Sequence, residues 1–97
     1  MIRHVVVFSW LPEATDEQKQ HAIARIGTLP PLMTGLVSYR FGVDIGVAQG
    51  NADFAITADF DDRVAYLAYR DHPAHVDVVQ HAMRPITAQR LAVQFEV

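Results

Sequence analysis

Tyr69 and His75 are the side chains in this sequence that best fit acid–base chemistry. They lie in the segment Tyr-Leu-Ala-Tyr-Arg-Asp-His-Pro-Ala-His, residues 66–75. An imidazole with a pKa of about 6.5 can remove a proton at neutral pH. A phenol beside it can donate a hydrogen bond to an enolate or carbonyl oxygen as charge develops. If the chain bends at His72-Pro73, both side chains can face one pocket that His4 also lines. Such a set would serve proton abstraction next to a carbonyl, the step that aldol closure needs.

Each of these side chains also has a structural interpretation. Tyr69 could be a partly buried aromatic whose hydroxyl bonds a backbone carbonyl, and His75 could hydrogen-bond the sheet. His72 could cap a helix that begins at Pro73. The residues alone leave the structural and the catalytic interpretation open.

A metal site needs facing nitrogen or carboxylate ligands, and the sequence offers His72, His75 and His81 with Asp71 and Asp77 nearby. However, the proline after His72 breaks the regular helical face, and no H-E-x-x-H pattern is present. The chain has no cysteine, which excludes disulfides, thiolate ligands and cysteine nucleophiles. We therefore expect no metal site.

The first element that must position these residues is a strand over residues 2–10, IRHVVVFSW. Its β-branched and aromatic content favours a strand, and Leu11-Pro12 ends it. His4, Val6 and Phe8 point to one face, and Val5 and Val7 point to the other. Since both faces are largely apolar, both should be covered.

The rest of the chain alternates helices and strands. Thr15 and Gln18 form a capping-box pattern before a helical apolar stripe, which Pro30-Pro31 ends. Strands follow over about 36–44 and 53–60, and Asp61 or Asp62 caps a second helix. This helix is interrupted at His72-Pro73 and continues over 73–83, and residues 90–97 form the last strand.

This order predicts one α+β domain over residues 1–97 with a ferredoxin-like βαββαβ fold. The four-stranded antiparallel sheet would carry both helices on one face and leave Val5 and Val7 on a bare apolar face. A soluble monomer seldom exposes such a face. We therefore expect a homodimer in which two helix-free sheet faces pack together.

At this point the sequence resembles the stress-responsive dimeric α/β-barrel (Dabb) proteins. The resemblance rests on the opening Ile2-Arg3-His4-Val5-Val6, on Phe60-Asp61-Asp62 and on Tyr69-x-x-His72-Pro73-Ala74-His75, with the closing Phe95-Glu96-Val97. It covers nearly the whole chain. It implies a dimeric α+β barrel.

The family includes polyketide cyclases like olivetolic acid cyclase, hydroxynitrile lyases and stress proteins without an established reaction. The resemblance to the cyclases implies that His75 is the catalytic histidine, Tyr69 its supporting tyrosine and His4 a further pocket histidine. It also implies a reaction without a metal or an organic cofactor. The chain departs from those cyclases at Ile23 and Ile26, where they have bulky aromatic residues. Tyr39 stands where they have a smaller aliphatic residue, so their substrate cannot be carried over.

A pocket for a small apolar or aromatic carbonyl compound would have a largely apolar lining. We expect it to be lined by His4, Val6, Phe8, Ile23, Ile26, Tyr39 and Ile56. All of the apolar members could equally be core residues.

Charge and hydropathy narrow the partners. The net charge is −3, and the eight basic residues are spread singly along the chain, so we expect no nucleic-acid partner. No apolar run reaches the roughly 20 residues of a membrane helix, and the opening residues are too short and strand-like for a signal peptide. We therefore expect a cytoplasmic protein without a membrane partner.

Three hypotheses for the function remain open. The first is a cofactor-independent cyclase, lyase or isomerase with His75 as general base and Tyr69 as hydrogen-bond donor. The second is a non-catalytic, stress-responsive binding or assembly protein. The third is a cofactor-free monooxygenase of the related dimeric barrel type, which the fold alone suggests.

Overall fold

The alternating side chains of the first strand decide the layers of the fold. In the computed structural model, which describes residues 1–97, strand β1 (Ile2–Trp10) buries every second residue. Ile2, His4, Val6 and Phe8 are buried beneath the helices, as the alternation predicts. The residues between them face the opposite side of the sheet and are only partly buried in the single chain.

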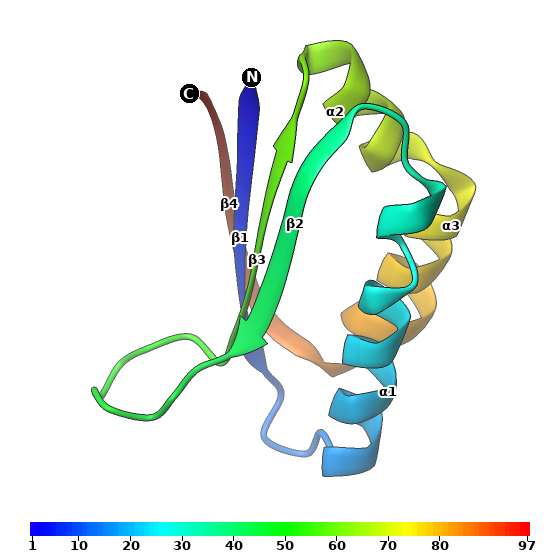
Figure 1. Ribbon diagram of the computed structural model, residues 1–97. Coiled ribbons are helices and arrows are strands. Elements are labelled where there is room, and N and C mark those ends of the chain that lie inside the picture. The colour runs from blue at the N-terminus through cyan, green and yellow to red at the C-terminus, as the bar shows by residue number, and fades with distance from the viewer.

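The remaining elements complete the predicted order (Figure 1). They are α1 (Asp16–Gly27), a 3₁₀ turn (Pro30–Leu32), β2 (Leu36–Val43), β3 (Phe54–Phe60), α2 (Arg63–Asp71), α3 (Pro73–Val78), a π-helical turn (Val79–Met83), a second 3₁₀ turn (Arg84–Ile86) and β4 (Thr87–Glu96). The sheet order is β2-β3-β1-β4, and every neighbouring pair is antiparallel. All helices lie on one face of the sheet, which confirms the ferredoxin-like α+β fold.

The helix starts follow the capping signals in the sequence. Thr15 and Gln18 form both hydrogen bonds of a capping box at the start of α1. The Asp62 carboxylate accepts a hydrogen bond from the Ala65 amide and so caps α2. None of the helices has the length and apolar character that crossing a membrane requires.

His72 joins α2 to α3. Its backbone is extended, so it ends α2, and its Nδ1 accepts a hydrogen bond from the Ala74 amide at the start of α3. Pro73 occupies the first position of α3, where its missing amide proton costs nothing. The predicted cap and break are therefore confirmed. The break thus divides residues 63–78 into two separate helices.

Gly35 sets the close approach of β2 and α2. Its φ angle is +79°, and an added Cβ would lie 2.7 Å from the Cβ of Ala65. Only glycine adopts this conformation readily and leaves that space. The Gly35 carbonyl also accepts a hydrogen bond from the Asp61 amide, which fixes the end of β3.

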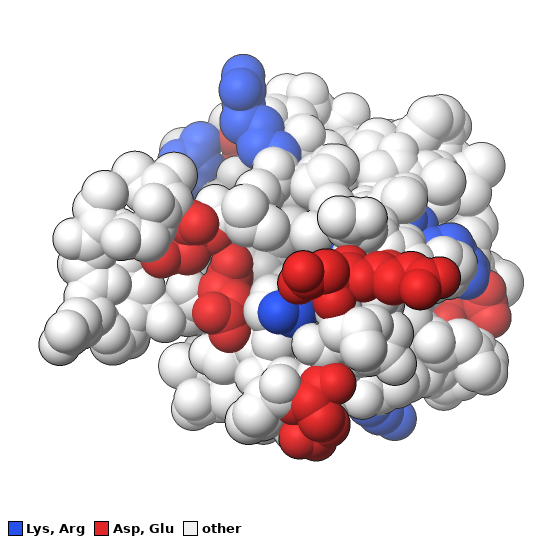
Figure 2. Space-filling view, turned by 90° about the horizontal axis from the view of Figure 1, so that it is seen from below, with Lys and Arg blue, Asp and Glu red and all other residues white.

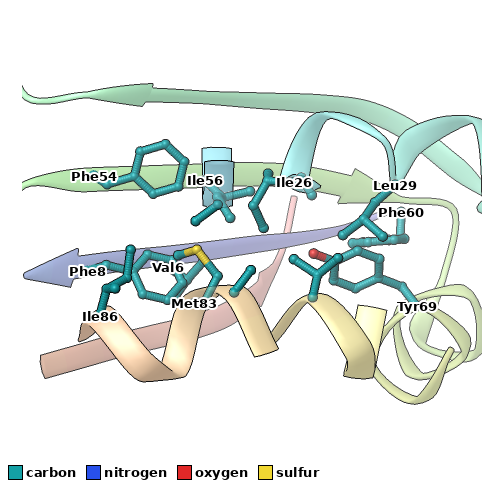
Figure 3. Packing of buried hydrophobic residues seen from close by; sticks show 14 residues of the cluster. Val6, Phe8, Ile26, Leu29, Phe54, Ile56, Phe60, Tyr69, Met83 and Ile86 are labelled. Atoms are coloured by element: carbon teal, nitrogen blue, oxygen red, sulfur yellow. The ribbon is translucent and has the colours of Figure 1, made fainter. Parts of the chain in front are cut away.

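The core fills the space between helices and sheet (Figure 3). Its largest fully buried side chains are Phe54, Phe60, Ile26, Leu29, Met83 and Val78. Each such side chain stabilises the fold by about 1.5–3 kcal/mol relative to exposure. These residues come from β3, α1, the segment after α1, α3 and the π-helical turn, so the core connects both layers.

Strand β4 is the least protected part of the sheet. It begins at Thr87, three residues before the predicted start at Arg90, because its pairing with β1 continues past a bulge at Ser9 and Trp10. Nearly all of its residues are exposed in the single chain. The sequence predicts a continuous helix over 73–83 and a loop after it. The structure instead has a π-helical turn and then a 3₁₀ turn before β4.

The helix-free sheet face is divided into an apolar and a polar half. On β4, Leu91 and Val93 lie beside Val7 and Val5 of β1, and both β4 residues are more than half exposed. On the other half, Arg3 forms a two-pronged ion pair with Asp59, with bonds of 2.8 and 3.0 Å. The apolar half is continuous across two neighbouring strands.

Candidate active site

The bend between α2 and α3 brings Tyr69 and His75 together. Their ring centroids are 4.2 Å apart, with 38° between the ring planes. Tyr69 is buried with 2% of its surface exposed, and His75 is partly exposed. A continuous helix would separate residues six positions apart by more than one turn along the axis. The contact therefore depends on the break at His72-Pro73.

The hydrogen bond of His75 determines which ring nitrogen is basic. Nδ1 lies 3.0 Å from the backbone carbonyl oxygen of Arg70. Because a carbonyl oxygen only accepts, Nδ1 of the neutral ring donates the hydrogen, which leaves the lone pair on Nε2. Burial, more than any nearby charge, holds the pKa of His75 below its ordinary value. At neutral pH His75 is thus an uncharged imidazole with a free basic nitrogen.

His4 has the opposite tautomer. The side-chain amide nitrogen of Gln94 lies 2.9 Å from Nδ1 of His4, and since this amide donates, Nδ1 accepts and Nε2 carries the hydrogen. Burial first, and the charges of Arg90 and His75 next, lower the pKa of His4 to about 4. His4 therefore offers an N–H donor rather than a base. Its ring lies 6.2 Å from that of Tyr69.

The Tyr69 hydroxyl is paired with the hydroxyl of Tyr39 at 3.0 Å. Burial raises the pKa of both phenols, so both keep their protons. One of the two hydroxyl hydrogens forms the bond between the tyrosines, and the other hydroxyl hydrogen is free to bond a further acceptor. The structural interpretation in which Tyr69 bonds a backbone carbonyl is wrong, and so is the one in which His75 bonds the sheet.

These side chains border one cavity of about 530 Å³ between the helices and the β1–β4 half of the sheet. His75 and Tyr69 lie in its wall, and of the predicted lining residues it contains His4, Val6, Phe8, Ile26 and Ile56. This volume lies within the usual range for small-molecule sites, roughly 300–1,000 Å³. The structure thus places both predicted catalytic residues and most predicted lining residues around one space.

Ile23 and Tyr39 do not line this cavity, which corrects the expected lining. Ile23 is partly buried and packs against the core from α1. Tyr39 stands on β2, on the far side of the sheet order from β4, and reaches the site only through its bond to Tyr69. The packing of helices on strands decides whether Ile23 and Tyr39 reach the cavity. The periodicity of one element gives only the face of that element on which a residue lies.

Several lining residues were not predicted from the sequence. They are Arg70, Val76, Val79, Gln80, Met83, Arg84, Thr87, Ala88, Gln89 and Arg90. Most lie in or next to the π-helical turn and the early start of β4, neither of which the sequence pattern showed. One signal was available in the sequence, since polar Arg90 and Gln94 alternate with apolar Leu91, Val93 and Phe95. In the structure Arg90 pairs with Phe8 and Gln94 with His4, so both lie on the same face as the predicted site.

The candidate metal ligands do not gather into one site. His72 caps α3 through its Nδ1, and His81 bonds Asp77 at 2.9 Å. No group of three or more histidine, aspartate or glutamate side chains is arranged to hold a metal ion.

The fold and the cavity define a ferredoxin-like α+β protein with a cavity lined in part by histidine and tyrosine. The model of the Stress responsive A/B Barrel Domain family, Dabb, matches residues 2–97, and the chain belongs to this family. No curated protein sequence is significantly similar to the chain.

Solved structures agree with this family. A dimeric ferredoxin-like protein of unknown function from Thermobifida fusca is 40% identical, with a TM-score of 0.92 over 99% of this chain and 90% of its own. A hydroxynitrile lyase from Passiflora edulis is 16% identical, with a TM-score of 0.86 over 99% of this chain and 92% of its own. SnoaB, a cofactor-independent oxygenase from Streptomyces nogalater, is 14% identical, with a TM-score of 0.78 over 99% and 91%. The last two share the fold, and their reactions differ.

Proposed function

We propose that this protein is a homodimeric, cofactor-independent lyase or cyclase that acts on a small carbonyl compound, with His75 as the general base. The observation that carries the proposal is the free Nε2 of a neutral His75, held against Tyr69 in the wall of a cavity. A purely structural role would account for the bond from His75 Nδ1 to the Arg70 carbonyl, but it gives Nε2 no function.

The proposed reaction begins with proton transfer. His75 Nε2 takes a proton from the carbon next to the carbonyl, and the electron pair moves onto the carbonyl oxygen. The N–H of His4 and the free phenolic hydrogen of the Tyr69–Tyr39 pair are the donors available for this oxygen. The enolate carbon then attacks a second carbonyl carbon, and the protonated His75 returns the proton to the new alkoxide. This return leaves His75 uncharged again, and the reaction needs no electron acceptor.

An exchange experiment tests the first step without knowledge of the natural product. In D₂O, the wild-type protein should accelerate deuterium incorporation next to the carbonyl of β-keto esters, followed by NMR. The rate should rise with pH through the lowered pKa of His75 and level off near or below neutrality, because only the uncharged ring accepts a proton. His75→Ala should lose most of this acceleration, typically a 10²–10⁴-fold effect for a general base.

His21→Ala is the matched control, since His21 is an exposed residue of α1 outside the cavity. It should exchange as fast as the wild type. Equal rates for the His75→Ala and wild-type proteins, at equal folding, would exclude His75 as the base.

The apolar half of the helix-free face supports the homodimer in this proposal. Leu91, Val93 and Phe95 are 60%, 54% and 46% exposed on one edge of the sheet, an arrangement that a second copy would cover. Solved relatives are described as dimeric. The same face favours the second candidate function, a non-catalytic binding or assembly protein. A protein that binds a small carbonyl compound but shows no deuterium exchange would support this second function. The monooxygenase alternative rests on fold likeness alone.

A further inference from the structure

The lining of the cavity differs in charge from the rest of the protein. The chain carries 11 acidic and 8 basic residues, and the end of the molecule seen in Figure 2 shows more acidic than basic side-chain surface. The cavity is lined by Arg70, Arg84 and Arg90 and by no aspartate or glutamate. An acidic protein thus gathers three of its few cations around one small, otherwise largely apolar space.

Two of these arginines lack an internal partner. Arg70 is bound by both oxygens of Asp71, at 2.9 and 3.1 Å. Arg84 and Arg90 form no ion pair and no side-chain hydrogen bond. Most other arginines of the chain do have an acidic partner, and the exception, Arg40, lies on β2 away from the cavity.

The position of Arg90 connects it to the proposed chemistry. It pairs with Phe8 of β1 and so lies on the same side of the sheet as His4. Burial is the main reason that the pKa values of His4 and His75 are low, and the charge of Arg90 lowers both further. Arg84 reaches the same cavity from the 3₁₀ turn that precedes β4.

The apolar part of the lining limits what an anion in this cavity can be. Val6, Phe8, Ile26, Val79 and Met83 contact the same space, and burying a free inorganic anion against them would cost solvation free energy without compensation. A ligand that fits both halves has an apolar or aromatic body with a charged group at one end.

We infer that the cavity binds an organic anion, with its apolar body against the β1 side chains and its carboxylate or phosphate held by Arg84 and Arg90. This inference rests on the proposed function in that it concerns the same site, and it names the substrate class. Guanidinium groups bind carboxylates and phosphates alike through paired hydrogen bonds. A carboxylate ligand and a phosphate ligand would therefore be recognised by the same chemistry.

Calorimetric titration of the full chain at low salt tests the inference with three probes of similar body: 4-phenylbutyrate, 4-phenylbutyl phosphate and the neutral 4-phenylbutanamide. At least one anion should bind, and the amide should bind at least about tenfold more weakly, as expected for the loss of a charge-assisted bond. The tighter of the two anions identifies the source. Changes in the ring signals of His75 and His4 in NMR should place the bound anion in the cavity.

Arg84→Gln and Arg90→Gln should each weaken anion binding by about 10–100-fold. Arg40→Gln removes the same charge from an exposed arginine that also lacks an acidic partner, and it should change binding less than about twofold. Equal binding of the amide and the anions, no binding of either anion, or unchanged affinity in both cavity variants would overturn the inference.

The two proposals can fail separately. His75→Ala should keep the preference for the anions over the amide, because this preference depends on the charges of Arg84 and Arg90 and needs no proton transfer. Anion binding in a wild-type protein that shows no deuterium exchange would count against the proposed reaction only. Exchange activity with no preference for anionic probes would count against the substrate class only.

Discussion

The Tyr39–Tyr69 pair gives a prediction whose size follows from the structure. Tyr69→Phe removes a hydroxyl from a side chain that is 2% exposed and leaves the Tyr39 hydroxyl without its partner. An orphaned buried hydroxyl costs about 1–3 kcal/mol, and the lower half of this range applies because Tyr39 is only partly buried. Tyr39→Phe orphans the more deeply buried Tyr69 hydroxyl and should cost about 1–3 kcal/mol.

The double variant should cost less than the sum of the two single variants by about 1 kcal/mol or more. Replacing both hydroxyls leaves no unpaired polar group, and such replacements are often nearly neutral. Urea unfolding at one fixed protein concentration measures these free energies, since the stability of a dimer depends on concentration. Strictly additive costs would show that the two hydroxyls do not bond each other in solution.

Activity should separate the same two variants. Tyr39→Phe keeps the Tyr69 hydroxyl in the cavity wall, so deuterium exchange should fall only slightly. Tyr69→Phe removes a donor from the site and should slow exchange by about 10-fold or more. Unchanged exchange in Tyr69→Phe would mean that Tyr69 acts only by packing, because phenylalanine keeps the ring and removes only the hydroxyl.

Three further predictions concern the dimer face, the buried histidine and the β2–α2 contact. Val93→Glu should turn a dimer into monomers in sedimentation at micromolar concentration, whereas Val64→Glu, which is 74% exposed on α2, should not; a dimer in both cases would place the interface elsewhere. The pKa of His4 is about 4 in the folded chain and higher when unfolded, so its contribution to stability is complete above pH 6.5 and is lost as the pH falls toward 4. His4→Gln should flatten this loss in urea titrations between pH 7 and pH 4, and an unchanged slope would contradict it. Gly35→Ala should destabilise the fold by more than the roughly 1–2 kcal/mol of a positive φ, because its Cβ would lie 2.7 Å from another side chain. Gly46→Ala, with open space around it, should cost only the free energy of the positive φ. Equal costs for the two variants in urea unfolding would show that α2 moves freely.

Local patterns were sufficient for much of the fold. The alternation in residues 2–10 gave the two faces of β1 correctly. Capping residues identified three helix starts, because capping depends on residues within one turn of the chain. They were Thr15, the pair Asp61 and Asp62, of which the structure uses Asp62, and His72. The break at His72-Pro73 also predicted that Tyr69 and His75 could meet, and their rings do.

The boundaries of the last elements were not available from local patterns. Residues 79–86 form a π-helical turn and a 3₁₀ turn instead of a regular helix and a loop. Strand β4 starts early because β1 offers pairing partners past its bulge. Both features depend on contacts with residues far away in the chain.

By itself, the sequence determined the βαββαβ order, the capped and broken helices, and the residue types available for proton transfer. Only the tertiary structure decided which nitrogen of His75 is free, since the Arg70 carbonyl selects the tautomer. It also decided that Arg84 and Arg90 border the same cavity as His4, and that Ile23 and Tyr39 do not. The physical reason is that periodicity assigns a side chain to a face of its own element, whereas a cavity is formed by the packing of several elements.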